Sequence, residues 1–134
     1  MAVQSVRGSE GKTRIYKMAV STTIVENTFV TFASGYITPA LSGTTELKLI
    51  ARQGATTDGS TNTEILCEEI DPSVIMVVDT AGNTSQALIG TKIDLTNAST
   101  ANQAATTTKV LDVVGIIGAV ADRKILCKAV TKDA

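Results

Sequence analysis

Short runs of aliphatic and β-branched residues, each ended by turn-forming residues, recur along almost the whole chain of 134 residues. Glu46-Leu47-Lys48-Leu49 alternates charged and apolar side chains with a period of two, which is typical of a half-buried strand. The Thr-rich stretch 97–108 lacks apolar periodicity, so we expect a loop there rather than a helix. About eight to ten short strands with turns between them predict an all-β fold, a small antiparallel β-barrel or sandwich.

The strongest strands share a continuous or alternating apolar pattern. They are predicted around residues 15–20, 29–32, 46–49, 65–67, 74–78, 92–95, 110–117 and 124–130. Gly115 interrupts the run 110–117 and predicts a bulge or bend. Asp71-Pro72-Ser73 is typical of a turn.

The first eleven residues differ in composition from the rest. Residues 1–11 are mostly polar and present no periodic apolar face, so we expect an extended, flexible N-terminal arm. Residues 12–134 have the length of a single domain. No apolar stretch is long enough for a transmembrane helix and no signal peptide is visible, so we expect a soluble protein made in the cytoplasm.

The residue types of most catalytic sites are missing. The chain has no His and only two Cys, Cys67 and Cys127, so a Ser or Cys nucleophile would lack its usual base. Two Cys are too few for a disulfide framework or a zinc site; one bridge is conceivable, and buried free thiols are the favoured alternative. We therefore predict no enzyme, no catalytic residue, no cofactor and no metal ligand.

Three weaker patterns could indicate a functional site, but each is also typical of ordinary surface residues. Glu69 and Asp71 would share one strand face and could form a glycosidase-like pair, but a solvated acidic turn is favoured. Asp79 and Asn83 lack the spacing of a calcium loop. The loop 54–60 resembles a phosphate-binding loop only superficially, because no Gly-Lys-Ser/Thr follows.

Charge is distributed unevenly although the net charge is only −1. That balance, together with 3% aromatic residues, argues against nucleic-acid binding. Basic residues gather near the N-terminus at Arg7, Lys12, Arg14 and Lys17. They predict a surface that docks on an acidic protein, the alternative being ordinary solvated charge.

The run Val74-Ile75-Met76-Val77-Val78 is apolar on both faces of the expected strand. Such a strand needs cover on both sides, either inside the core or at an interface between subunits. Val74, Met76 and Val78 are therefore candidates for self-association as well as for the core.

Over residues 12–130 the chain resembles the head decoration, or cement, proteins of tailed bacteriophages. A succession of segments carries the resemblance: Ser34-Gly35-Tyr36-Ile37-Thr38-Pro39-Ala40, the small loop Ser42-Gly43-Thr44, Gly90-Thr91-Lys92-Ile93-Asp94-Leu95 with the Thr-rich loop after it, Lys109-Val110-Leu111-Asp112-Val113-Val114-Gly115 and Arg123-Lys124-Ile125-Leu126-Cys127-Lys128. It implies a non-enzymatic virion protein on the capsid exterior, a dimer or trimer that binds the major capsid protein and stabilises the phage head.

A second hypothesis is a ligand- or carbohydrate-binding β-module on a virion fibre or tail. Such a module would expose an aromatic side chain, and Tyr16 and Tyr36 are the candidates. The low aromatic content of the chain weighs against it.

Overall fold

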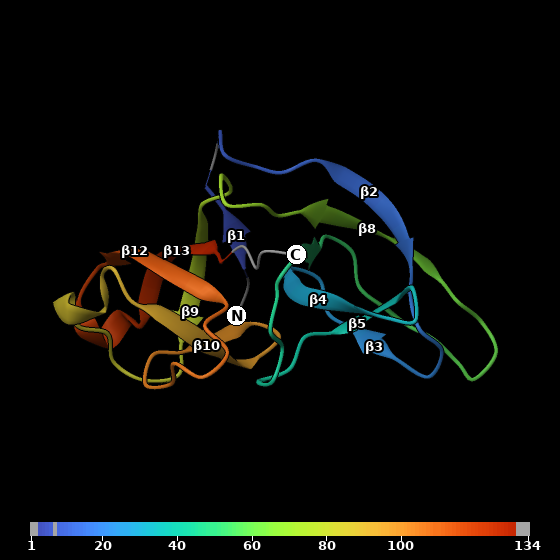
Figure 1. Ribbon diagram of the computed structural model, residues 1–134. Helices are drawn as coiled ribbons and strands as arrows, with labels where there is room; N and C mark the ends of the chain where they lie inside the picture. Colours follow the sequence, from blue (N-terminus) through green and yellow to red (C-terminus); the bar gives the residue numbers. More distant parts are fainter. Residues whose placement is uncertain (1–2, 7, 131–134) are drawn as a thin grey trace.

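The computed structural model describes residues 3–6 and 8–130, and within these the chain is almost entirely β-structure (Figure 1). The strands are β1 Gln4–Ser5, β2 Thr13–Lys17, β3 Thr23–Ile24, β4 Thr28–Ala33, β5 Tyr36–Pro39, β6 Leu49–Ala51, β7 Ala55–Thr56, β8 Glu64–Glu69, β9 Met76–Thr80, β10 Lys92–Asn97, β11 Thr100–Asn102, β12 Leu111–Ile117 and β13 Lys124–Ala129. The described helices are two single 3₁₀ turns, η1 Gln86–Leu88 and η2 Val120–Asp122. The predicted all-β class is confirmed.

The strands of the C-terminal half form one sheet together with β1, and its pairings return from the last strand to β9. The order is β1-β9-β11-β10-β12-β13, and β13 pairs again with β9. The β9–β11 pair is parallel, whereas the other pairs in this sheet are antiparallel. The register of β12 against β13 shifts between Val113 and Gly115, so the bulge predicted at Gly115 is present.

The N-terminal half forms a second sheet with the order β2-β8-β6-β4-β5, all antiparallel. Its two outer strands meet at one parallel bridge between Met18 and Ile37. A separate two-stranded sheet, β3-β7, lies on the same side of the molecule (Figure 1).

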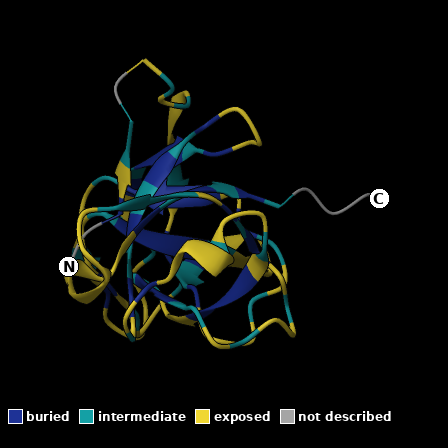
Figure 2. Ribbon diagram, turned by 90° about the vertical axis from the view of Figure 1, so that its left-hand side faces the viewer, coloured by how far each residue is buried: buried dark blue, intermediate teal, exposed yellow. Residues whose placement is uncertain are grey.

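Each sheet has its own aliphatic core, and the buried segments follow the strands of both (Figure 2). The larger core contains Phe29, Ile50 and Cys127 and packs the C-terminal sheet against one face of β4 and β6. The smaller core contains Met18 and Cys67 and fills the interior of the N-terminal sheet. Both cysteines are free and buried, as the favoured alternative predicted.

The predicted strand at Glu46–Leu49 is displaced, because the structure places β6 at Leu49–Ala51. Leu47 packs in the larger core and Leu49 in the smaller one. The alternating pattern therefore does not line one face of a strand; it marks a crossing between two cores.

Val74, Met76 and Val78 all pack in the larger core, with at most 1% of each residue exposed. A side chain without accessible surface cannot contact a second copy. The self-association role predicted for these three residues is therefore corrected to a core role, the other alternative that the sequence left open.

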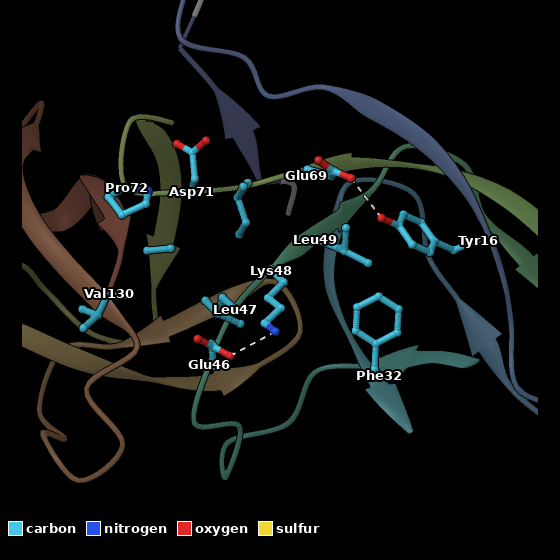
Figure 3. A pocket seen from close by; sticks show the side chains of 12 residues that line it. Tyr16, Phe32, Glu46, Leu47, Lys48, Leu49, Glu69, Asp71, Pro72 and Val130 are labelled. Atoms are coloured by element: carbon cyan, nitrogen blue, oxygen red, sulfur yellow. Dashed lines mark hydrogen bonds and ion pairs between the residues drawn. The ribbon is translucent and has the colours of Figure 1, made fainter. Parts of the chain in front are cut away.

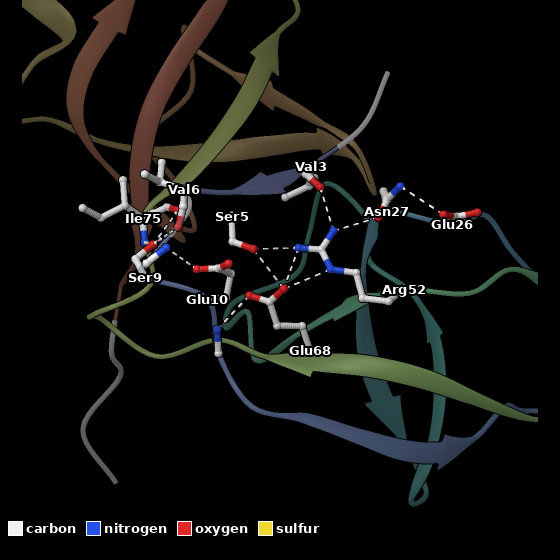
Figure 4. Close-up of polar contacts among 12 residues, drawn as sticks. Val3, Ser5, Val6, Ser9, Glu10, Glu26, Asn27, Arg52, Glu68 and Ile75 are labelled. Carbon is white, nitrogen blue, oxygen red and sulfur yellow. Dashed lines mark hydrogen bonds and ion pairs between the residues drawn. The ribbon is translucent and has the colours of Figure 1, made fainter.

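The N-terminal segment packs on the body rather than extending from it as the expected arm (Figure 4). Val3 is fully buried, β1 pairs with β9, and the amide N–H of Val6 donates to the carbonyl of Ile75. Gly11 passes so close to β8 that an added Cβ would lie 1.6 Å from the carbonyl oxygen of Glu69. A glycine is therefore required at this position.

A buried ion pair holds this segment in place (Figure 4). Arg52 donates through Nη2 to Oε1 of Glu68 at 2.7 Å and through Nε at 3.0 Å. Its remaining donors reach the carbonyl oxygen of Val3, Oδ1 of Asn27 and Oγ of Ser5. Glu68 also accepts from Ser5 Oγ and from the amide of Gly11. The pair thus connects β6, β8 and the N-terminal segment.

Candidate functional site

Three of the four basic residues predicted to bind a partner lie together on or beside β2. Lys12, Arg14 and Lys17 are exposed, and the fourth, Arg7, lies outside the described residues. Arg14 Nε forms an ion pair with Glu69 Oε1 at 2.8 Å. Among the described residues, Lys12 and Lys17 have no ion-pair partner, so their charges are available to another molecule.

One edge of β2 is open at Thr13 and Ile15. The carbonyl of Lys12 accepts the amide of Glu69, and the amide of Met18 donates to the carbonyl of Thr63. Backbone groups alternate between the two edges of a strand. The N–H and C=O groups of Thr13, Ile15 and Lys17 therefore point away from β8. No described strand pairs with Thr13 or Ile15 there, whereas β5 lies beside Lys17, where Met18 bridges to Ile37.

A pocket of about 350 Å³ adjoins β2 on the face of Tyr16 (Figure 3). Phe32, Leu49 and Glu69 line one side, and Pro72 and Val130 line the other. A second pocket of about 630 Å³ beside it, bordered by the loop 41–45, shares Phe32 with the first pocket. The pocket therefore lies where the N-terminal sheet meets the end of β13.

Tyr16 and Phe32 form the aromatic wall of this pocket. Their ring centroids are 5.5 Å apart and the planes are 69° from parallel, an edge-to-face contact. Tyr16 Oη donates to Glu69 Oε1 at 3.1 Å. Desolvation, followed by this bond and the Glu69 charge, raises the pKa of Tyr16, so its hydroxyl remains a proton donor.

Glu69 and Asp71, the two carboxylates considered for a glycosidase-like pair, both line the pocket. A glycosidase needs one carboxyl group with a raised pKa to act as the general acid. The side-chain hydroxyl and backbone amide of Ser73 instead lower the pKa of Asp71. Glu69 already accepts from Tyr16 and Arg14.

The other weak candidates are engaged elsewhere. Asp79 pairs with Lys124 at 2.7 Å, and Asn83 accepts a hydrogen bond from Arg123. Tyr36 is exposed on β5 and does not line the pocket that contains Tyr16. Within residues 3–6 and 8–130, no three Cys, Asp or Glu side chains converge as a metal site, and no helix is long and apolar enough to cross a membrane.

Neither free thiol is expected to react while the protein is folded. Burial raises the pKa of Cys67 to about 11 and raises that of Cys127 further. We expect a disulfide reagent at mildly alkaline pH to titrate almost no thiol in the native protein and both thiols after denaturation. Rapid native labelling of Cys67 would contradict its burial in the smaller core.

No protein-family model, curated protein or solved structure matches the chain. The resemblance to phage decoration proteins therefore stays a hypothesis.

Sequence reasoning found the basic residues of β2 but missed the open edge and the pocket beside it. The available signal was Tyr16 within a basic, alternating stretch. The strand order that leaves one edge of β2 unpaired depends on β8, about fifty residues further along the chain, so no local pattern reveals it.

Proposed function

We propose that this protein is a non-enzymatic decoration protein that docks on the major capsid protein of a tailed-phage head. The observation that carries the proposal is the exposed segment 12–17, which combines the charges of Lys12 and Lys17 with a backbone edge of β2 that is open at Thr13 and Ile15. A basic surface steers and orients binding to an acidic partner. On the capsid exterior, the contact would be repeated over the lattice.

The remaining features are compatible with this role. A small β-barrel or sandwich with two aliphatic cores is a stiff body, which a reinforcing protein requires. A dimer or trimer would engage several capsid subunits at once, so that modest affinity for each site gives tight overall binding. Because Val3 is buried and Gln4–Ser5 pair with β9, the proposed contact is β2 rather than residues 3–5.

Reversing the free charges on β2 should abolish docking. We expect Lys12→Glu/Lys17→Glu to weaken binding to expanded shells by about 100-fold or more, because two attractions become repulsions. Co-sedimentation with shells assembled from the major capsid protein of the same genome measures this.

Lys92→Glu is the matched control, since Lys92 is an exposed strand residue on β10 in the other sheet. It should bind the shells as the unmodified protein does. Equal binding by the β2 double variant would remove β2 from the interface. A genome without a capsid gene, or no binding by the unmodified protein, would overturn the proposed function itself.

The pocket favours a second candidate, a ligand- or carbohydrate-binding module on a virion fibre or tail. An aromatic wall with nearby carboxylates can stack on a sugar ring and accept its hydroxyl groups. A glycan array showing a signal that disappears in Tyr16→Ala and persists in Tyr36→Ala would support this candidate.

A further inference from the structure

The outer edge of β2 offers a partner two outward-facing backbone positions, Thr13 and Ile15, before β5 meets the edge at the bridge between Met18 and Ile37. Unpaired strand edges are templates for another extended chain, which adds through main-chain hydrogen bonds. The side chain of Ile15 is exposed and stands on the outer face, so it does not cover the edge. The edge is therefore geometrically free to accept a strand.

Charge determines which strand this edge can accept. In an antiparallel pair of two β2 strands, the basic residues of one copy would lie close to those of the other, and like charges across strands are destabilising. An incoming strand with carboxylates opposite Lys12, Arg14 and Lys17 would form attractive pairs instead. Self-pairing at this edge is thus disfavoured, and acidic partners are favoured.

The pocket adds a second requirement. Side chains directly opposite one another on neighbouring strands lie on the same face. The partner residue opposite Tyr16 would therefore point toward the wall formed by Tyr16 and Phe32. An apolar side chain there would bury the exposed part of Phe32.

We infer that β2 accepts an extended acidic segment of a partner protein as an added antiparallel strand. The segment carries carboxylates opposite Lys12, Arg14 and Lys17 and an apolar side chain opposite Tyr16. This inference rests on the proposed function and deepens it, because it names the kind of capsid segment that is bound. Backbone bonds supply affinity, while the charges and the pocket fix the register.

The test uses a peptide that satisfies these requirements, acetyl-Thr-Glu-Leu-Val-Glu-Thr-Glu-amide. Titrated into the full-length protein and followed by NMR, it should slow hydrogen exchange at the amides of Thr13 and Ile15. Amides of Arg14 and Tyr16, which already face β8, should change little. This alternation distinguishes strand addition from a purely electrostatic contact.

The matched control peptide carries an N-methyl group on its Val and has the same charge. The Val lies opposite Ile15 in the proposed register, where its N–H would bond to β2. Loss of this N–H of the peptide Val, together with the bulk of the added methyl group, should weaken peptide binding by about tenfold. Equal binding of the two peptides would overturn strand addition.

A protein variant blocks the edge without changing charge. Because the Ile15 N–H points away from β8, Ile15→Pro removes no bond within the sheet, and proline is tolerated at such edge positions. We expect it to fold and to lose peptide and shell binding by about tenfold or more, whereas Ile15→Ala should retain both. Circular dichroism and thermal unfolding verify the fold.

The outcomes separate the two proposals. Shell binding that is lost in Lys12→Glu/Lys17→Glu but kept in Ile15→Pro would overturn strand addition and leave the decoration role standing. Peptide binding with alternating protection, but no shell binding by the unmodified protein, would support strand addition and overturn the capsid assignment.

Discussion

Replacing Arg52 with Ala should reduce the free energy of unfolding by about 3–5 kcal/mol, because it leaves the Glu68 carboxylate buried without its counter-ion. The Glu68 residue is only 4% exposed, and Arg52 is its ion-pair partner at 2.7 Å. The variant also removes the donors that reach Val3 and Ser5. Chemical denaturation followed by circular dichroism measures the loss.

Arg14→Ala is the matched control. Arg14 also pairs with a glutamate of β8, Glu69, but 64% of its side chain is exposed. Exposed ion pairs contribute less than about 1 kcal/mol, so this variant should unfold at nearly the same denaturant concentration as the unmodified protein. Equal losses in Arg14→Ala and Arg52→Ala would contradict the special role of the buried pair.

The double variant Arg52→Ala/Glu68→Ala separates the ion pair from simple loss of packing. Because neither charge is then left alone, its cost should be smaller than the sum of the two single variants. Arg52→Ala should in addition speed proteolytic removal of the first residues, since Val3 and Ser5 lose their anchor. Unchanged proteolysis would show that the other contacts hold the segment.

The alternating and continuous apolar patterns predicted much of the strand content. The bulge at Gly115 and the strands around 65–67 and 124–130 are where the sequence placed them, because local pattern and final packing agree there. At Glu46–Leu49 the same pattern misleads, since Leu47 and Leu49 belong to different cores. Period-two alternation reports burial of alternate side chains and does not report which core receives them.

The N-terminal segment shows what composition cannot predict. Its polar residues are compatible with a free arm, but Val3 and Ser5 find partners in Arg52 and Glu68, which are distant in sequence. Glu68 directly precedes Glu69, which the sequence places in a solvated acidic turn, but Glu68 is buried and pairs with Arg52. The basic character of β2 was predictable, whereas its open edge depends on the order of strands in the sheet.

Asp94 organises the loop that follows β11. Its carboxylate accepts the amides of Thr107, Thr108 and Lys109 at 3.1, 2.9 and 2.9 Å. Lys109 has a φ of 54°, a left-handed conformation that costs a non-glycine residue about 1 kcal/mol. The three bonds to one buried carboxylate offset that cost and set the course of the chain into β12.

We therefore expect Asp94→Asn to lower the free energy of unfolding by about 2–3 kcal/mol, because hydrogen bonds to a charged acceptor are stronger than those to an amide and one acceptor oxygen is lost. Asp122→Asn is the control, since Asp122 is exposed and accepts a backbone bond from Ala119 alone. If Asp94→Asn lowered the free energy of unfolding no more than Asp122→Asn does, Asp94 would not anchor the loop.

Acid should reproduce the Asp94→Asn effect in the unmodified protein. Burial acts to raise the pKa of Asp94, but the amides of Lys109, Thr107 and Thr108 outweigh it, so the folded pKa lies below the ordinary 3.8. A depressed folded pKa means that this stabilisation is complete above the unfolded pKa and is lost as the pH falls through the folded one. Across that pH window, the free energy of unfolding should fall less steeply with acid for Asp94→Asn than for the unmodified protein, as denaturation curves at each pH measure. The same pH dependence in both proteins would show that the hydrogen bonds from the three amides do not require the charge of Asp94.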